Sequence, residues 1–259
     1  MIFNVGDYVT RESYNNDVLF KVLKIENDKA YLKGVELRLL ADAPLVDLKL
    51  SEGDVLYSED EKILNEGESL RNDKYFYLPG KVLHLDGDSE YLERCLNFYK
   101  KNKILAIGKK IKEENMSNQV LSLLKEYRPD ILIITGHDAY NKKSKNLSDL
   151  KNYKNSINFV KSVKEARKYE KSHEKLVIIA GACHSDYEEL IKAGANFASS
   201  PKRVNIHALD PAIIAVVLAS TERGQEIDLI ELLSKTKYGA AGIGGIISRG
   251  LMYVGYPRS

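Results

Sequence analysis

The sequence predicts an α/β protein with a mostly parallel sheet flanked by helices, preceded by a small SH3-like β-barrel. From residue 75 onward, short apolar runs alternate with stretches of helical period, which is typical of a parallel sheet covered on both faces. Two of these runs, 130–135 and 176–180, are rich in β-branched residues, as buried strands are. Residues 1–60 instead hold closely spaced strand-like runs and turns, which favours a small barrel.

Composition limits the possible functions. Hydrophobic residues make up 44% and charged residues 29% of the 259 positions, as in soluble globular proteins. A net charge of +2 gives no sign of bulk nucleic-acid binding. No apolar run approaches a membrane span, and residues 1–13 lack a signal-peptide pattern, so we expect cytoplasmic synthesis. Two cysteines in such a chain argue against a disulfide framework. Nothing indicates a cofactor, and the oligomeric state is not predicted.

The amino-terminal part divides into two segments. The barrel is expected over residues 1–60, and turn residues separate its strand-like runs. Residues 61–74 continue an acidic, polar stretch that indicates a linker. The barrel carries no catalytic constellation, so a docking role is the simplest interpretation. Strands are expected over 3–9, 18–25, 30–35 and 38–40.

The α/β domain is expected over residues 75–259. Its predicted strands cover 81–85, 103–107, 130–135, 176–180 and 196–199, and its predicted helices cover 91–101, 119–127, 157–171, 212–221 and 229–233. Cys95 lies in a helical pattern and is interpreted as a small buried hydrophobe. The glycine-rich tail, 238–257, lacks the strand and fingerprint of a nucleotide site.

A histidine and a cysteine follow two of the predicted strands. His137 comes after 130–135 and Cys183 after 176–180, so both are expected at the edge of the sheet where α/β proteins bind ligands. A helix that begins near residue 186 favours the thiolate of Cys183. The two side chains make a candidate nucleophile–base pair. Gly136 and Gly181 leave room for them and supply candidate amides for an oxyanion.

The spacing narrows the chemistry. His137 precedes Cys183 by 46 residues (183 − 137), and caspase-type cysteine peptidases place the histidine about 50 residues before the cysteine. Ala182 before the cysteine also fits. Asp138 after the histidine and His184 after the cysteine depart from that pattern. The order and spacing therefore predict a caspase-like cysteine peptidase.

Alternatives remain open at this level. His207 is a rival base, because the segment 181–185 also resembles a nucleophile elbow with cysteine in place of serine. That pairing would give an amidotransferase-like hydrolase, although the His-x-Glu step usual there is missing. A non-catalytic coat assembly protein is a third possibility. Asp86 and Asp88 flank a strand end and can line the cleft, but turn chemistry explains them equally well. No zinc spacing is present, so no metal is expected.

Three segments together resemble one family. FNVGDYVTRESYNNDVLFKV, ITGHDAY and GACHSDYEELIKAGANFASSPKRVNIHALDPA are similar to the YabG sporulation-specific proteases of endospore-forming bacteria, over nearly the whole chain. The resemblance implies a cysteine peptidase made in the mother cell and later associated with the spore coat. It implies coat and cortex-associated protein substrates, cleaved after arginine, and a catalytic pair at His137 and Cys183.

An arginine preference requires an acidic S1 pocket, because a buried guanidinium is costly without a carboxylate. Asp138, Asp186 and Asp210 are the candidates near the proposed site, with Glu188 beside them. Asp210 is favoured, since it follows the loop after the nucleophile. A helix N-cap is nevertheless the better explanation of Asp210-Pro211 than a substrate contact.

Overall fold

The computed structural model describes residues 3–51, 74–141 and 149–257, and its amino-terminal unit is a small antiparallel sheet. Its strand order is β4-β3-β2-β1-β5. Residues 61–73 of the predicted linker and 142–148 of the loop after His137 lie outside these ranges. The strands are β1 (Tyr8–Arg11), β2 (Phe20–Glu26), β3 (Lys29–Gly34), β4 (Leu40–Pro44) and β5 (Leu48–Leu50), with 3-10 turns at Glu12–Tyr14 and Leu45–Asp47.

A hydrophobic core stabilises this unit, formed by the side chains on the inward face of its strands. Val9, Phe20 and Leu32 are fully or almost fully buried in its core, on the inward face that strand periodicity gives them. The turn between β2 and β3 contains Asn27 at a φ of 53°, a conformation that asparagine tolerates better than most residues. The small β unit predicted at the amino terminus is therefore confirmed, as an antiparallel sheet.

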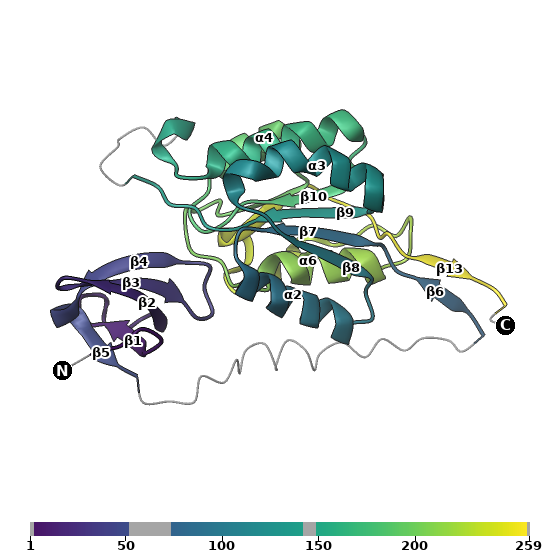
Figure 1. Cartoon of the computed structure of the whole chain (residues 1–259). Helices are drawn as coiled ribbons and strands as arrows, with labels where there is room; N and C mark the ends of the chain where they lie inside the picture. The colour runs from purple at the N-terminus through teal and green to yellow at the C-terminus, as the bar shows by residue number, and fades with distance from the viewer. Residues whose placement is uncertain (1–2, 52–73, 142–148, 258–259) are drawn as a thin grey trace.

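The main sheet has six strands in the order β12-β11-β10-β9-β7-β8 (Figure 1). All neighbours pair in parallel except β12, which pairs antiparallel with β11. Every residue of β7, β9 and β10 is buried, which explains the nearly continuous apolar sequences of β9 and β10. The strands are β7 (Val82–Asp86), β8 (Ala106–Lys110), β9 (Ile131–Thr135), β10 (Val177–Ala180), β11 (Phe197–Ser199) and β12 (Ile243–Gly245).

Helices cover both faces of this sheet, as Figure 1 shows for α3 and α4 on one side and α2 and α6 on the other. Ile131 and Ile133 of β9 pack toward the α2–α6 side, while Leu132 and Ile134 pack toward the α3–α4 side. The helices are α2 (Ser89–Lys101), α3 (Glu113–Tyr127), α4 (Ser156–Tyr169), α5 (Tyr187–Ala193), α6 (Asp210–Ser220) and α7 (Leu229–Ser234). The α/β class is confirmed. No helix in the described ranges is long and apolar enough to span a bilayer.

The sequence misplaced some elements. Helix α3 begins at Glu113, six residues before the expected start, and β8 begins only at Ala106. The glycine-rich tail contributes β12 and a strand, β13 (Tyr253–Gly255), that pairs with β6 (Phe76–Leu78). These strands have no apolar alternation, so their pairing depends on the tertiary fold. Gly245 fits against β11 because a Cβ there would lie 2.4 Å from Phe197.

The amino-terminal unit lies at the carboxyl ends of the parallel strands (Figure 1). Leu37, in the connection between β3 and β4, forms an isolated antiparallel bridge with His207, in the loop before α6. The two units therefore meet at the edge of the sheet where the site was predicted.

Candidate active site

The carboxyl ends of three neighbouring strands carry the polar side chains of this site. Ile134 of β9 pairs in register with Ala180 of β10. His137 and Cys183 each come three residues beyond that pair, and Asp88 comes two residues after β7 ends. Because these strands are parallel and adjacent, the register brings all three residues to one edge of the sheet.

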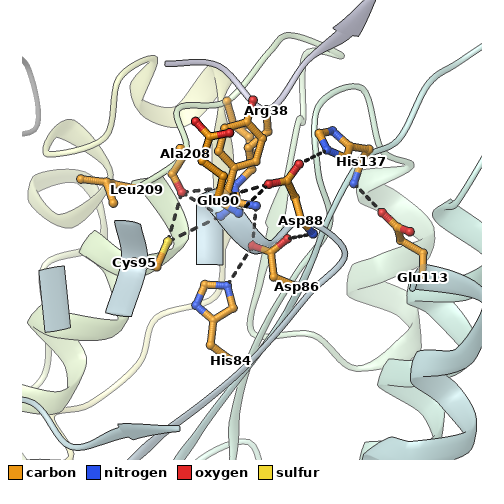
Figure 2. A network of polar contacts seen from close by, with 12 residues as sticks. Arg38, His84, Asp86, Asp88, Glu90, Cys95, Glu113, His137, Ala208 and Leu209 are labelled. Atoms are coloured by element: carbon orange, nitrogen blue, oxygen red, sulfur yellow. Dashed lines mark hydrogen bonds and ion pairs between the residues drawn. The ribbon is translucent and has the colours of Figure 1, made fainter. Parts of the chain in front are cut away.

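His137 is held in one orientation by its surroundings (Figure 2). Its Nε2 lies 3.0 Å from Asp88 Oδ2, and its backbone N–H donates to Glu113 Oε1 at 2.9 Å. Asn155 Nδ2 donates to the His137 carbonyl at 2.8 Å, and the Tyr91 ring centroid lies 5.6 Å from the imidazole. The Nδ1 atom is buried and makes no hydrogen bond within the described part of the chain. One ring nitrogen is thus fixed by a carboxylate, and the other is left for a reacting group.

Asp88 is a charged partner for that imidazole. Burial favours its neutral form, but the contacts of its oxygens with His137 and with the Lys33 ammonium outweigh burial. The Lys33 Nζ–Asp88 Oδ1 distance is 2.8 Å. The pKa of Asp88 is consequently well below its ordinary value, and the carboxylate stays ionised at neutral pH.

Cys183 is fully buried in this structure. The Ile206 N–H points at its Sγ, 3.3 Å away, and the Sγ lies 3.8 Å from the Ile206 carbonyl oxygen. Burial raises the pKa of the thiol to about 12, which is opposite to the expected effect of the following helix. The Gly181 amide, at a φ of +106°, donates to the Ile134 carbonyl at 3.0 Å. The Cys183 thiol is therefore inaccessible to solvent in this structure.

The carboxylates predicted for substrate binding have other partners. Asp138 accepts hydrogen bonds from the hydroxyls of Ser156 and Ser185 and from two backbone N–H groups, and it joins the loop after β9 to the loop after β10. Asp186 is the N-cap of α5 and lies 3.5 Å from Arg203 Nη2. These two residues lie beside the site, but their contacts fix loops.

Asp210 is buried at the start of α6. The structure places Leu209 at the N-cap position, so the N-cap interpretation of Asp210 was wrong. The Asp210 carboxylate instead accepts the backbone N–H groups of His207 at 2.8 Å and Lys237 at 2.9 Å. Burial raises its pKa to about 6. Asp210 thus anchors the loop that precedes α6.

His207, the alternative base, is buried in that same loop. Its Nδ1 accepts the N–H of Leu209 at 3.2 Å, so this nitrogen carries no proton in that contact. Burial, followed by nearby basic side chains, lowers its pKa to about 3. The neutral imidazole thus stabilises the loop before α6 by accepting a backbone hydrogen bond.

The neutral state of His207 predicts an acid-sensitive fold. The unfolded chain, with a histidine pKa of about 6.5, binds a proton that the folded chain binds only near pH 3. Its stability contribution is therefore complete above about pH 6.5 and is lost as the pH falls toward 3. His207→Asn keeps an acceptor near the Nδ1 position. We expect it to flatten the pH dependence of the free energy of unfolding by up to about 1.4 kcal/mol per pH unit between about pH 6 and 4.

Urea unfolding of both proteins at several pH values measures this slope. Asp210 has a raised pKa, so its protonation stabilises the folded state as the pH falls, opposite to the effect of His207. Because Asp210 is present in both proteins, its contribution cancels in the difference between their unfolding free energies. Parallel pH profiles for the two proteins would contradict the assignment of a neutral, buried His207.

Several site residues were missed or left undecided at the sequence level. Asp86 and Asp88 were equally well explained by a turn, and Cys95 was expected only to fill space. Arg38 lies in the amino-terminal unit, and its Nη1 is 2.7 Å from Asp86 Oδ2, but it carried no local signal in the sequence. Glu113 had an indirect one: a Cβ at Gly136 would lie 2.4 Å from its carboxylate, so that glycine makes room for it. Within the described ranges, no group of three or more His, Cys, Asp or Glu residues is arranged to hold a metal ion.

Known proteins are similar to this chain over nearly its whole length. The family model described as YabG peptidase U57 matches residues 4–70 and 57–257. The chain is also 45% identical, over 286 aligned residues, to the sporulation-specific protease YabG of Bacillus subtilis (strain 168), and the alignment covers 99% of each chain. The similarity therefore includes the amino-terminal unit as well as the α/β unit.

Proposed function

The chain belongs to the YabG peptidase U57 family, and from this premise we propose that it is a cysteine endopeptidase with Cys183 as nucleophile and His137 as general base. One observation carries the proposal: His137 and Cys183 occupy matching positions after two paired parallel strands. The fixed imidazole supports it, because a catalytic base needs a defined orientation. The order of the pair, histidine first, is that of a caspase-like peptidase.

Asp88 acts on the reaction through His137. Its carboxylate lies 3.0 Å from Nε2, which keeps a proton on that nitrogen and directs the unprotonated Nδ1 toward the reacting atoms. It also stabilises the imidazolium that forms when the thiol gives up its proton. Asp88 is thus a positioning residue.

The reaction follows from these roles. His137 Nδ1 takes the Cys183 proton, and the thiolate attacks the carbonyl carbon of the scissile peptide bond. The imidazolium protonates the amine as the C–N bond breaks, which leaves a thioester on Cys183. Water then attacks the thioester carbonyl while His137 takes a proton from that water. The C–S bond breaks, the new carboxyl end leaves, and the imidazolium returns its proton to the Cys183 thiolate. The oxyanion is assigned to backbone amides near Gly136 and Cys183, because the Gly181 amide already donates to Ile134.

The cellular role follows the family. We propose cleavage of spore coat and cortex-associated proteins after arginine during sporulation, by an enzyme made in the mother-cell cytoplasm that later joins the coat. The 45% identical relative carries the name of a sporulation-specific protease, which supports the setting. The arginine preference is supported by the family resemblance. It is also supported by the buried side chain of Arg38, which is held beside the site by Asp86.

The experiment compares wild type with Cys183→Ala on an arginine-rich spore-coat extract, and mass spectrometry maps the new termini. We expect fragments that end in arginine with wild type and a loss of cleavage in the variant by at least about a thousandfold, since the nucleophile is essential. Circular dichroism shows whether the variant is folded. Equal cleavage by both proteins would rule out Cys183 as nucleophile, and fragments without arginine at the new carboxyl ends would overturn the specificity.

A further inference from the structure

Arg38 extends from the amino-terminal unit into the site of the α/β unit (Figure 2). Its side chain is fully buried, and its Nη1 lies 2.7 Å from Asp86 Oδ2. Its Nε and Nη2 donate to the Ala208 carbonyl at 3.2 and 2.9 Å, and Nη2 lies 3.5 Å from Cys95 Sγ. The Tyr91 ring forms one wall, with its centroid 5.1 Å from Cζ. The α/β unit therefore contains a closed pocket that fits a guanidinium group.

The main chain around Arg38 pairs with the loop before α6 through an isolated antiparallel bridge. The Arg38 N–H donates to the Ile206 carbonyl at 3.1 Å, and the Ala208 N–H donates to the Glu36 carbonyl at 2.9 Å. Leu37 lies between these two bonds and forms the bridge with His207. Pairing of an extended segment with an open edge is a general way to recognise peptides.

This paired segment is linked to the proposed nucleophile through Ile206. Ile206 accepts the Arg38 N–H with its carbonyl and points its own N–H at Cys183 Sγ, 3.3 Å away. One residue thus links the Arg38 backbone to the sulfur. The Tyr91 hydroxyl donates to the Leu37 carbonyl at 2.8 Å, while its ring packs 5.6 Å from His137. Ile206 and Tyr91 thus connect Leu37 and Arg38 to the immediate surroundings of both proposed catalytic side chains.

The pocket carboxylate is held within the α/β unit. Asp86 Oδ1 accepts the Asp88 N–H at 2.9 Å, and Asp86 Oδ2 lies 3.5 Å from His84 Nε2. His84 is itself fixed by Tyr99, whose hydroxyl lies 2.9 Å from Nδ1. Asp86 would keep these contacts if Arg38 left, so the pocket is preorganised for another cation.

We propose that this pocket is the S1 site of the peptidase, that Asp86 is the carboxylate that recognises the arginine of a substrate, and that Glu36, Leu37 and Arg38 occupy the cleft as a built-in substrate mimic. The inference rests on the proposed cysteine endopeptidase function. Arg38 then occupies the P1 position and Leu37 and Glu36 the P2 and P3 positions. The acidic S1 residue is Asp86, in place of Asp138, Asp186 or Asp210.

Two consequences follow from the occupied cleft. A substrate must displace residues 36–38 before its arginine reaches Asp86, so the chain is latent while the two units are docked. The burial that raises the pKa of Cys183 to about 12 belongs to this docked state. Weakening the contact of Arg38 should therefore raise the activity on small peptides.

The experiment measures the selectivity for arginine at P1. It uses the variant Arg38→Gln, in which residues 36–38 bind the cleft more weakly. Two fluorogenic peptides, with Glu-Leu-Arg or Glu-Leu-Gln before the scissile bond, report the ratio of their kcat/KM values. We expect Arg38→Gln to cleave the arginyl peptide faster than wild type, in a manner that requires Cys183. Adding Asp86→Asn should lower the Arg:Gln ratio by about 100-fold or more, because the guanidinium loses its charged partner.

Two further double variants serve as comparisons. Arg38→Gln/Asp42→Asn removes an equal charge from the barrel surface, where Asp42 pairs with Lys29, and should keep the ratio. Arg38→Gln/Asp210→Asn tests the carboxylate favoured by sequence. Arg38→Gln/Asp86→Glu keeps the pocket charge and serves if Asp86→Asn does not fold. It should lower kcat/KM for the arginyl peptide while still favouring arginine over glutamine.

The possible outcomes separate the S1 assignment from the function. Cys183-dependent cleavage whose Arg:Gln ratio ignores Asp86, or follows Asp210, overturns the S1 assignment and leaves the peptidase intact. Cleavage no faster in Arg38→Gln than in wild type overturns the mimic. Absence of Cys183-dependent cleavage in every background overturns the proposed function, and the inference with it.

Discussion

Replacing His137 by alanine is expected to lower kcat/KM for an arginyl peptide by about 10³- to 10⁵-fold while leaving the fold intact. The imidazole has to take a proton from a buried thiol and return it to the leaving amine. Its Nε2 is occupied by Asp88 and its Nδ1 makes no hydrogen bond within the described ranges, so Nδ1 is the ring nitrogen left for this proton transfer. Progress curves at several pH values, with the Arg38→Gln background used to open the cleft, measure the loss.

Two other histidines provide matched controls. His173 lies just before β10, at the opposite end of the sheet from Cys183, so His173→Ala should retain wild-type kcat/KM. His207→Asn tests the rival base. If activity survived His137→Ala and disappeared in His207→Asn, the catalytic pair proposed above would be wrong and the amidotransferase-like alternative would regain support.

The proposed catalytic pair was accessible from sequence because its signal is local. Each of His137 and Cys183 follows a strand-like apolar run and a glycine, and parallel strands place their carboxyl ends together. Asp88 belongs to an Asp-Gly-Asp turn whose composition has a purely local explanation. Only the register of β7 against β9 shows that this turn also faces the histidine.

The proposed S1 pocket was not accessible in this way. Arg38 and Asp86 are 48 residues apart in the chain and belong to different units. A single arginine in a strand-rich segment gives no sign of burial, since arginine side chains are usually exposed. Asp210 was favoured because it lies downstream of the nucleophile, but its carboxylate is occupied by two backbone N–H groups. The decisive information is the docking of one unit on another.

The helix α3 shows the same limit on the fold. Of its first residues, 113–118, only Met116 is apolar, and Lys112 at the N-cap makes no side-chain capping bond, so the start carries only a weak local signal. The early start matters because Glu113 then reaches the His137 backbone, at 2.9 Å. Tertiary contact at the site thus determines a helix boundary that the local sequence leaves open.

Arg38→Met is expected to cause the largest loss of stability at the interface between the units. It leaves the Asp86 carboxylate in the pocket without its cation, and breaking one side of a buried ion pair costs about 3–5 kcal/mol. Asp86→Leu should cost a similar amount, since it leaves the Arg38 guanidinium unpaired. The double variant replaces both charges by apolar groups and should recover most of the loss, with a coupling energy of about 3 kcal/mol.

Urea unfolding followed by circular dichroism at 222 nm, on all four proteins of the cycle, measures this coupling. Limited proteolysis of the connecting segment reports whether the two units separate first. Lys29→Met and Asp42→Leu form a matched cycle on the barrel surface, where both side chains are about half exposed, and should couple by less than about 1 kcal/mol. Additive losses for Arg38 and Asp86 would show that their contact contributes nothing specific to docking.

The pH dependence of this cycle identifies the charge responsible. In wild type, burial favours neutral Asp86, but the Arg38 charge overcomes it and the pKa of Asp86 is lowered. The contribution of this carboxylate is thus present above its unfolded pKa of about 3.9 and is lost as the pH falls further. In Arg38→Met, burial acts without the opposing cation, so the pKa of Asp86 rises and the sign reverses: stability is retained at low pH and lost as the pH rises. The gap in unfolding free energy between wild type and Arg38→Met should therefore be smaller at pH about 5 than at pH about 8. A gap that does not change with pH would mean that lost packing of the arginine side chain, and not an unpaired Asp86, weakens the variant.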